Sequence, residues 1–301
     1  MAVVINTNVD SLKIQSLLTN STNKMSQSMQ RMSSGLKILS AKDDAAGTVI
    51  SAKMQVQLNG NQIAQKNVQN ANALLSTAEG NLDVVEDNLS RIRDLTLQAK
   101  NGTYSSEEIK AMQDEVTQRV AEINRINDSA KYSSLKLFGE DDGLAGTGAT
   151  FQVGSDAGKD NTIKASEELF KTVNFSALTG TSAGIDLTTL KSSGDPSFVA
   201  NGVTPVGGDT DFDVAVRALD NAINNITNRK SIIGSAGNRM DSALNTLSTQ
   251  YENLSSAKSI ITDADVAAEA SNFTQQQILQ QVSTSLLAQA NQAPSIALSL
   301  V

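Results

Sequence analysis

The sequence predicts a mainly α-helical protein: a long coiled-coil-like helical rod formed by paired N- and C-terminal segments, with a small β-hairpin region in mid-chain. Three observations predict this fold class. Residues 219–261 and 64–99 both carry apolar side chains at alternating steps of four and three. This heptad spacing is typical of a helix that packs along its whole length against another helix. Between residues 139 and 208 the heptad spacing is lost, and 12 of the 19 glycines lie there.

The segment 219–261 is the strongest helix prediction in the chain. At about 1.5 Å per residue it would extend roughly 65 Å, and a single helix cannot cover its own apolar stripe. A partner helix is therefore required. No proline interrupts the segment, and ten of its thirteen seam positions are apolar: Leu219, Ile223, Ile226, Lys230, Ile233, Gly237, Met240, Leu244, Leu247, Tyr251, Leu254, Lys258 and Ile261.

At the N-terminal end, residues 6–39 are predicted to form a helix with a weaker seam. Asn6, Thr7 and Asn8 are suitable N-caps for it. Ser40 is followed three residues later by Asp43, a capping-box pattern that we expect to begin the second helix. The weaker seam consists of Leu18, Thr22, Met25, Met29, Met32, Leu36 and Leu39.

The second helix is predicted to end at the turn signal Asn101–Gly102. A further capping box, Ser105 with Glu108, predicts a third helix, which we expect to fold back antiparallel because the connection is short. The second seam consists of Ala64, Val68, Ala71, Leu75, Ala78, Leu82, Val85, Leu89, Ile92, Thr96 and Ala99, and the third of Ile109, Met112, Val116, Arg119, Ile123, Ile126 and Ala130.

Mid-chain, the short pieces 149–153, 161–164 and 172–175 predict a β-hairpin region with Gly-rich turns. We expect residues 176–208 to form a loop or excursion. A Ser/Thr-x-x-acid pattern at Thr262–Asp265 predicts a break and a restart. The last helix is expected to stop at Pro294, and the apolar tail 296–301 to be buried against a partner.

The two chain ends carry opposite charges, which favours their pairing. Residues 1–42 hold five basic side chains against one acidic, and residues 257–301 hold one basic against three acidic. Exposed ion pairs contribute only about 0–1 kcal/mol, so charge favours the pairing without dominating it.

Composition excludes several function classes. The net charge of −8 argues against a nucleic-acid partner. Without Cys or His the chain lacks thiolate nucleophiles, imidazole bases and the usual zinc ligands.

Three motifs could suggest a site, and each has a simpler interpretation. We interpret Asp43–Asp44 as a helix start and Gly154–Asp160 as a turn rather than a phosphate loop. The stretch Gly139–Gly143 lacks the ligand pattern of a calcium site. We expect no enzymatic activity, no cofactor, no metal, no secretory signal and no membrane insertion.

Both ends of the chain resemble the bacterial flagellins, over roughly residues 1–176 and 211–301. The N-terminal similarity lies in Val4–Asn8, Met32–Ile38 and Ser40–Gly47. The C-terminal similarity lies in Ala264–Asp265, Gln276–Gln281 and Ser285–Gln292.

The resemblance implies a domain layout. Residues 1–42 and 257–301 would form the two halves of an inner-tube helical domain. Residues 43–176 would form the N-terminal part of a rod domain with its β-hairpin region, and residues 211–256 its C-terminal helix. Residues 177–210 would be a short variable loop in place of the large outer domains of other flagellins.

The resemblance also implies a function and partners. The chain would be a structural subunit of the extracellular flagellar filament, exported by the flagellar type III apparatus. It would polymerise with itself and meet the filament cap, hook-junction proteins and an export chaperone. Packing between subunits and in the inner tube would involve Leu18, Met25, Met29, Met32, Ile278, Val282, Leu286, Leu287, Leu298 and Leu300.

Two immune-recognition regions follow from the same resemblance. Arg91, Leu95 and Glu115 fall where Toll-like receptor five contacts this family. The span Gln30–Ser51 resembles the epitope that plant receptors sense.

Other functions remain open at this point. A hook–filament junction protein shares the end-to-end helical plan, and a cytoplasmic coiled-coil adaptor would share the seams. A flagellin with an inserted zinc protease would need a His-Glu-x-x-His helix, which a chain without His lacks.

Overall fold

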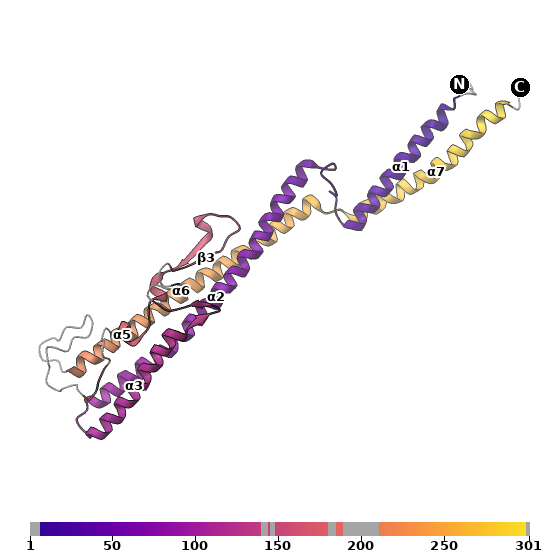
Figure 1. Cartoon of the computed structure of the whole chain (residues 1–301). Coiled ribbons are helices and arrows are strands. Elements are labelled where there is room, and N and C mark those ends of the chain that lie inside the picture. The colour runs from indigo at the N-terminus through magenta and orange to yellow at the C-terminus, as the bar shows by residue number, and fades with distance from the viewer. Residues whose placement is uncertain (1–6, 140–143, 145–147, 180–184, 189–210, 299–301) are drawn as a thin grey trace. The chain divides into compact units, whose positions relative to one another are not determined.

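A computed structural model describes residues 7–139, 144, 148–179, 185–188 and 211–298 of the chain. It confirms the predicted fold class, since the described residues are mainly helical and the first and last helices lie side by side (Figure 1). The chain divides into two compact units. We call residues 1–59 with 251–301 the terminal unit, and residues 60–250 the central unit. The long helices are α1 (Val9–Ser34), α2 (Ala45–Lys100), α3 (Ser106–Ser129), α6 (Asp211–Thr262) and α7 (Val266–Leu298).

Helix α1 is shorter than predicted. Of the three candidate caps, Asn8 is confirmed, because its Oδ1 accepts a hydrogen bond from the Ser11 amide at 3.0 Å. The helix ends at Ser34 instead of residue 39, because Gly35 takes the left-handed conformation with φ 71°. That conformation is a common helix stop, and glycine adopts it without steric cost.

The breaks at the two ends of the chain lie together in the terminal unit. The Lys37 amide donates to the Thr262 carbonyl at 2.7 Å, and the Ala264 amide donates to the Gly35 carbonyl at 2.9 Å. The predicted restart after Thr262 is confirmed, because Asp265 Oδ1 accepts from the amides of Ala267 and Ala268 at 2.9 and 3.2 Å.

The predicted start of the second helix at Ser40–Asp43 is wrong. The Asp43 carboxylate accepts from the amides of Ser40 and Leu39 at 3.0 and 3.2 Å, which closes a turn ahead of the helix. Helix α2 begins at Ala45, and Asp44 Oδ1 accepts from the Gly47 amide at 2.9 Å. The expectation that this acidic pair marks a helix start therefore holds for Asp44.

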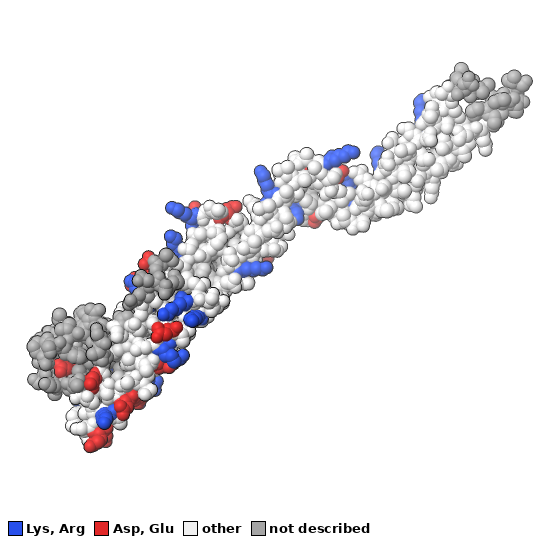
Figure 2. Space-filling view, viewed as in Figure 1, with Lys and Arg blue, Asp and Glu red and all other residues white. Residues whose placement is uncertain are grey.

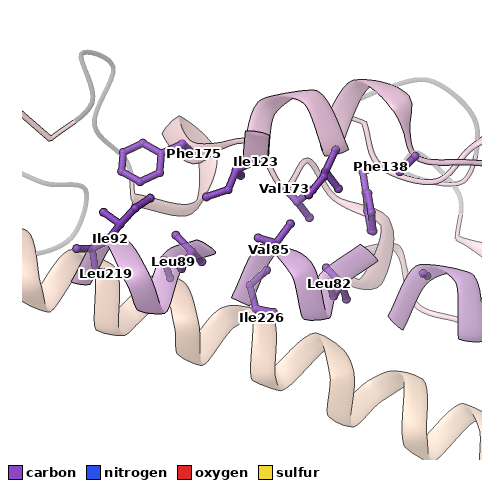
Figure 3. Close-up of a cluster of buried hydrophobic side chains, with 14 of the residues drawn as sticks. Leu82, Val85, Leu89, Ile92, Ile123, Phe138, Val173, Phe175, Leu219 and Ile226 are labelled. Atoms are coloured by element: carbon purple, nitrogen blue, oxygen red, sulfur yellow. The ribbon is translucent and has the colours of Figure 1, made fainter. Parts of the chain in front are cut away.

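Both long seams are confirmed; they lie in the central unit, except for the last four positions of α6, which belong to the terminal unit. All eleven predicted seam residues of α2 are buried, and none of the thirteen of α6 is exposed. Figure 3 shows Leu82, Val85 and Leu89 of α2 lying between Ile226 of α6 and Ile123 of α3. Burying such side chains is worth roughly 1.5–3 kcal/mol each. Helix α3 begins with the predicted capping box, in which Ser105 and Glu108 exchange both hydrogen bonds.

Two antiparallel hairpins lie between α3 and α6. Strands β3 (Ala149–Gln152) and β4 (Thr162–Ala165) pair Ala149 with Ala165, which confirms the predicted hairpin. The hairpin of β1 (Lys131–Tyr132) and β2 (Leu135–Lys136) was not predicted, because Ser133 makes its tight turn at φ 57° without a glycine or asparagine. The turn between β3 and β4 holds the short η1 (Lys159–Asn161), and α4 (Glu167–Phe170) and α5 (Phe175–Thr179) follow the hairpin.

The predicted third strand, residues 172–175, is wrong. The amides of Val173 and Phe175 donate to the side-chain oxygens of Asn127 and Asn124 on α3, at 3.1 and 3.0 Å. These two asparagines occupy the donors that a neighbouring strand would need. Most of the predicted loop 176–208 lies outside the described residues.

Candidate assembly surfaces and the Arg91 cluster

In the terminal unit, α1 and α7 pack through a seam in which six of the twelve positions are polar. Going along each helix in steps of three and four, the less exposed positions are Ile14, Leu18, Ser21, Met25, Ser28 and Met32 on α1, and Glu269, Phe273, Gln276, Gln280, Ser283 and Leu287 on α7. Three serines, Ser21, Ser28 and Ser283, are the buried members. The predicted seam is therefore correct at Leu18, Met25 and Met32 but wrong at Thr22 and Met29, which face outward. It is also wrong at Leu36 and Leu39, which are exposed and lie beyond the end of α1.

Hydrogen bonds and one ion pair cross this seam. Ser21 Oγ donates to Gln276 Oε1 at 3.0 Å. Arg31 Nη1 lies 3.1 Å from Glu269 Oε1, which confirms that oppositely charged ends meet. The pKa of the Glu269 carboxyl lies below its ordinary value because of the hydrogen bond from Ser28 and the nearby Arg31, although burial opposes the shift.

Many large apolar side chains of the terminal unit are exposed. Of the 20 large hydrophobic residues that are exposed in the described part of the chain, 15 belong to this unit. Leu58 is the one buried hydrophobic residue among its described residues. Four of the predicted packing residues are exposed, namely Met29, Ile278, Val282 and Leu286. Leu287 lies half-buried in the seam, whereas the side chain of Leu298 and all of Leu300 lie outside the described residues.

Charge is also divided unequally between the units. The terminal unit contains seven basic and seven acidic residues, so the whole net charge of −8 belongs to residues 60–250. Helix α7 has a single charged residue, Glu269, among its 33 residues. Figure 2 shows few coloured side chains over α1 and α7 and many over the central unit. The outer face of α7, which is apolar at Ile278, Leu279, Val282 and Leu286 and nearly uncharged, is typical of a surface that another molecule covers.

A cluster of charged side chains lies on the outer surface of α2 and α3. Arg91 donates from Nε and Nη2 to the two carboxylate oxygens of Glu115, at 2.8 and 3.1 Å. Arg119 donates to Asn88 Oδ1 at 3.1 Å, and it also lies near Glu115. These contacts confirm that α3 folds back antiparallel on α2. Hydrogen bonds from Arg91 hold the pKa of Glu115 below its ordinary value.

Leu95 does not join this cluster. Its side chain is 2% exposed and packs in the core of the central unit. It immediately precedes the seam residue Thr96, which is also buried. The structure therefore brings Arg91 and Glu115 together on the surface and places Leu95 beneath it.

A metal site and a membrane span were both sought among the described residues. Within them, no group of three or more carboxylates is placed to hold a metal ion. No helix among the searched residues is long and apolar enough to cross a membrane. The stretch from Gly154 to Asp160 forms the turn between β3 and β4, as predicted, where Gln152 Nε2 donates to the carbonyl of Asp156 at 2.9 Å.

Comparison with known proteins identifies the family. Residues 5–142 match the bacterial flagellin N-terminal helical region, and residues 216–301 match the bacterial flagellin C-terminal helical region. The chain belongs to the bacterial flagellin family. It is 35% identical to a flagellin of Serratia marcescens over 356 aligned positions, with all of both chains covered. It is 33% identical to the flagellar filament 33 kDa core protein of Treponema phagedenis, covering 99% of this chain and 100% of that one.

A solved structure shows that the fold alone does not single out flagellins. A protein described as a putative flagellar hook-associated protein from Vibrio parahaemolyticus matches with a TM-score of 0.54 and 15% identity, over 73% of this chain and 99% of that chain. The two sequence matches to flagellin decide between the families. As a flagellin, the chain is a structural subunit of the extracellular flagellar filament, and the hook–filament junction alternative is not favoured.

Proposed function

We propose that this flagellin polymerises by covering the outward-facing apolar side chains of α1 and α7 with the same helices of neighbouring copies. The observation that carries the proposal is the exposed apolar face: half of the seam between α1 and α7 is polar, while Met29, Ile278, Val282 and Leu286 face outward. A second copy supplies a matching apolar face. A contact of this kind that repeats without closing builds a helical filament.

The domain layout is part of the same proposal. Residues 1–42 and 257–301 would line the inner tube of the filament, and residues 43–256 would form the outer rod domain. Helix α7, with Glu269 as its one charged residue, suits a position among other subunits, because a charge that is buried without a partner is costly. The net charge of −8 carried by residues 60–250 suits a hydrated position.

A truncation tests this proposal. Removing residues Gln289–Val301 deletes the last part of α7 but leaves the buried core of the central unit intact. The shortened chain should unfold at the same denaturant concentration as the full chain, yet fail to extend filaments from seeds. Electron microscopy and sedimentation measure assembly, and circular dichroism measures the fold. Normal filaments from the truncated chain would contradict the proposed role of this end.

Recognition by Toll-like receptor five is proposed for the surface formed by Arg91 and Glu115. Leu95, whose side chain is buried, would affect recognition through the packing of α2. Arg91→Ala should lower receptor signalling at least severalfold while the chain stays folded. Arg125→Ala is the matched control, because Arg125 pairs with Glu122 within helix α3 at 2.6 Å and lies outside the cluster. Equal signalling from the two variants would reject the assignment.

Further partners are proposed from the resemblance alone. The exposed apolar face of α7, with Ile278, Leu279 and Val282, offers an export chaperone a surface to cover before assembly. The filament cap and hook-junction proteins would meet the same face at the filament ends, and export would use the flagellar type III apparatus. The span Gln30–Ser51 would serve as an epitope for plant receptors.

A further inference from the structure

Pro294 lies inside α7, where the sequence predicts that the helix should stop. In an α-helix the amide of residue 294 would donate to the carbonyl of residue 290. Proline has no amide hydrogen, so it cannot make this bond. The side chain of Asn8, at the start of α1, donates from Nδ2 to the Ala290 carbonyl at 2.8 Å. A residue from the other end of the chain thus contacts the carbonyl that Pro294 leaves without its usual donor.

The same asparagine caps α1. Its Oδ1 accepts a hydrogen bond from the Ser11 amide at 3.0 Å, so one side-chain amide group bonds to the backbone of both helices. Ser11 in turn donates from Oγ to Asn291 Oδ1 at 2.9 Å, one residue after Ala290. Aspartate is an equally good N-cap, but its carboxylate has no hydrogen to donate. The contact with Ala290 therefore favours asparagine over aspartate at this cap.

We propose that Asn8 supplies the hydrogen-bond donor that Pro294 lacks, and that it thereby fixes the end of α7 against the start of α1. Without Asn8, the proline would leave the last turns of α7 with an unpaired carbonyl. With the bond from Asn8, those turns stay helical while the start of α1 lies beside them. The two ends of the chain then become ordered together. The use of this device in filament assembly rests on the proposed function, whereas the coupling between Asn8 and Pro294 does not.

A double-mutant cycle tests the coupling. Asn8→Asp keeps the cap and removes the donor, and Pro294→Ala restores the amide that α7 lacks. Asn8→Asp should speed hydrogen exchange of the amides of α7 around residue 291 by about threefold to tenfold, the range expected for one lost hydrogen bond. In the Pro294→Ala chain the same change should have less than about a twofold effect, since the restored amide at position 294 then donates to the Ala290 carbonyl. Asn20→Asp, an exposed position of α1, is the matched control and should change nothing.

Exchange is measured both on the unassembled chain and on assembled filaments, so that two failures can be told apart. If the unaltered chain forms no filaments, the proposed function fails, and the cycle is still measured in solution. The coupling is overturned if Asn8→Asp changes the exchange rate equally with and without Pro294. It is also overturned if Asn8→Asp leaves the exchange rate unchanged both in the unassembled chain and in filaments. A larger effect of Asn8→Asp in the chain that contains Pro294 supports it.

Discussion

In the two units of this flagellin, apolar side chains on long helices are covered in different ways. In the central unit the seam of α2 is apolar at ten of eleven positions, and its side chains are buried by α3 and α6. In the terminal unit the seam between α1 and α7 buries three serines, and most large apolar residues face outward. A helix that puts its apolar face inward completes its own core. A helix that turns this face outward needs a second molecule to complete it.

The comparison shows why the units differ in independence. Hydrophobic burial is the main favourable contribution to folding, and the central unit obtains it within one chain. Short polar side chains such as Ser21 and Ser28 give the α1–α7 pair specific hydrogen bonds but little apolar burial. Most of the apolar burial available to the terminal unit therefore remains to be made on assembly.

The largest expected effect comes from the same substitution made in each unit. Leu89 of α2 is fully buried and Leu286 of α7 is 47% exposed. Leu89→Ala should lower the free energy of unfolding by about 2–5 kcal/mol, because it leaves a cavity. Leu286→Ala should change it by less than about 0.5 kcal/mol and should instead slow filament extension.

Denaturant unfolding of the unassembled chain and seeded assembly measure the two effects separately. Equal losses of stability from the two variants would remove the distinction between the units.

Acid should act on the terminal unit through Glu269. Its folded pKa lies below the ordinary value of 4.5. Its contribution is therefore present above pH 4.5 and is lost as the pH falls through the folded pKa. Glu269→Gln should weaken the α1–α7 pairing by roughly 1–3 kcal/mol at neutral pH, because Arg31 loses its charged partner.

Hydrogen exchange in α1 and α7, followed from pH 7 downward, measures this loss. The Gln variant should show less dependence on pH than the unaltered chain. If both chains lose pairing along the same pH curve, the Arg31–Glu269 contact is not what holds the helices.

The sequence predicts the central unit better than the terminal one, for a physical reason. Where a helix buries its apolar face inside the chain, the heptad pattern and the packing coincide, as they do from Ala64 to Ala99. In α1 the pattern marks Met29 although the structure buries Ser28. An apolar pattern shows that a face must be covered, and it does not show whether the cover comes from this chain or from another.

Long-range hydrogen bonds account for several of the other differences. The asparagines at 124 and 127 end the expected third strand by bonding to its amides. Asn8 contacts the carbonyl that Pro294 cannot bond, although 282 positions separate Asn8 from Ala290. Local propensity contains no information on such contacts.

The burial of Leu95, by contrast, could be predicted from the sequence alone. Leu95 lies three residues after Ile92 and four residues before Ala99, and both of these are seam residues. Residues spaced by three and four lie on one face of a helix. This spacing predicts that Leu95 lies beside the seam, and its side chain is buried there.

The smallest expected effect concerns the polar pairs that flank the seam between α2 and α6 in the central unit. Four pairs keep one antiparallel register, since the residue numbers in each sum to 313: Asn72–Asp241, Asp83–Lys230, Arg93–Asp220 and Lys100–Asp213. Lys230 is itself a seam residue, and its Nζ lies 2.6 Å from Asp83 and 2.9 Å from Glu86. These two carboxylates raise the pKa of its ammonium group, so the pairing persists at neutral pH and is lost only in strong alkali.

Replacing Lys230 by leucine separates the contribution of charge from that of packing. Lys230→Leu removes the ion pairs but extends the apolar seam, so the free energy of unfolding should change by no more than about 1 kcal/mol in either direction. Lys230→Glu places a third acidic group beside Asp83 and Glu86 and should destabilise more, with the loss reduced by added salt. Denaturant unfolding at two salt concentrations measures both. If Lys230→Leu destabilised the chain as much as Leu89→Ala, charge pairs rather than buried apolar side chains would hold the central unit together, and its contrast with the terminal unit would have to be drawn differently.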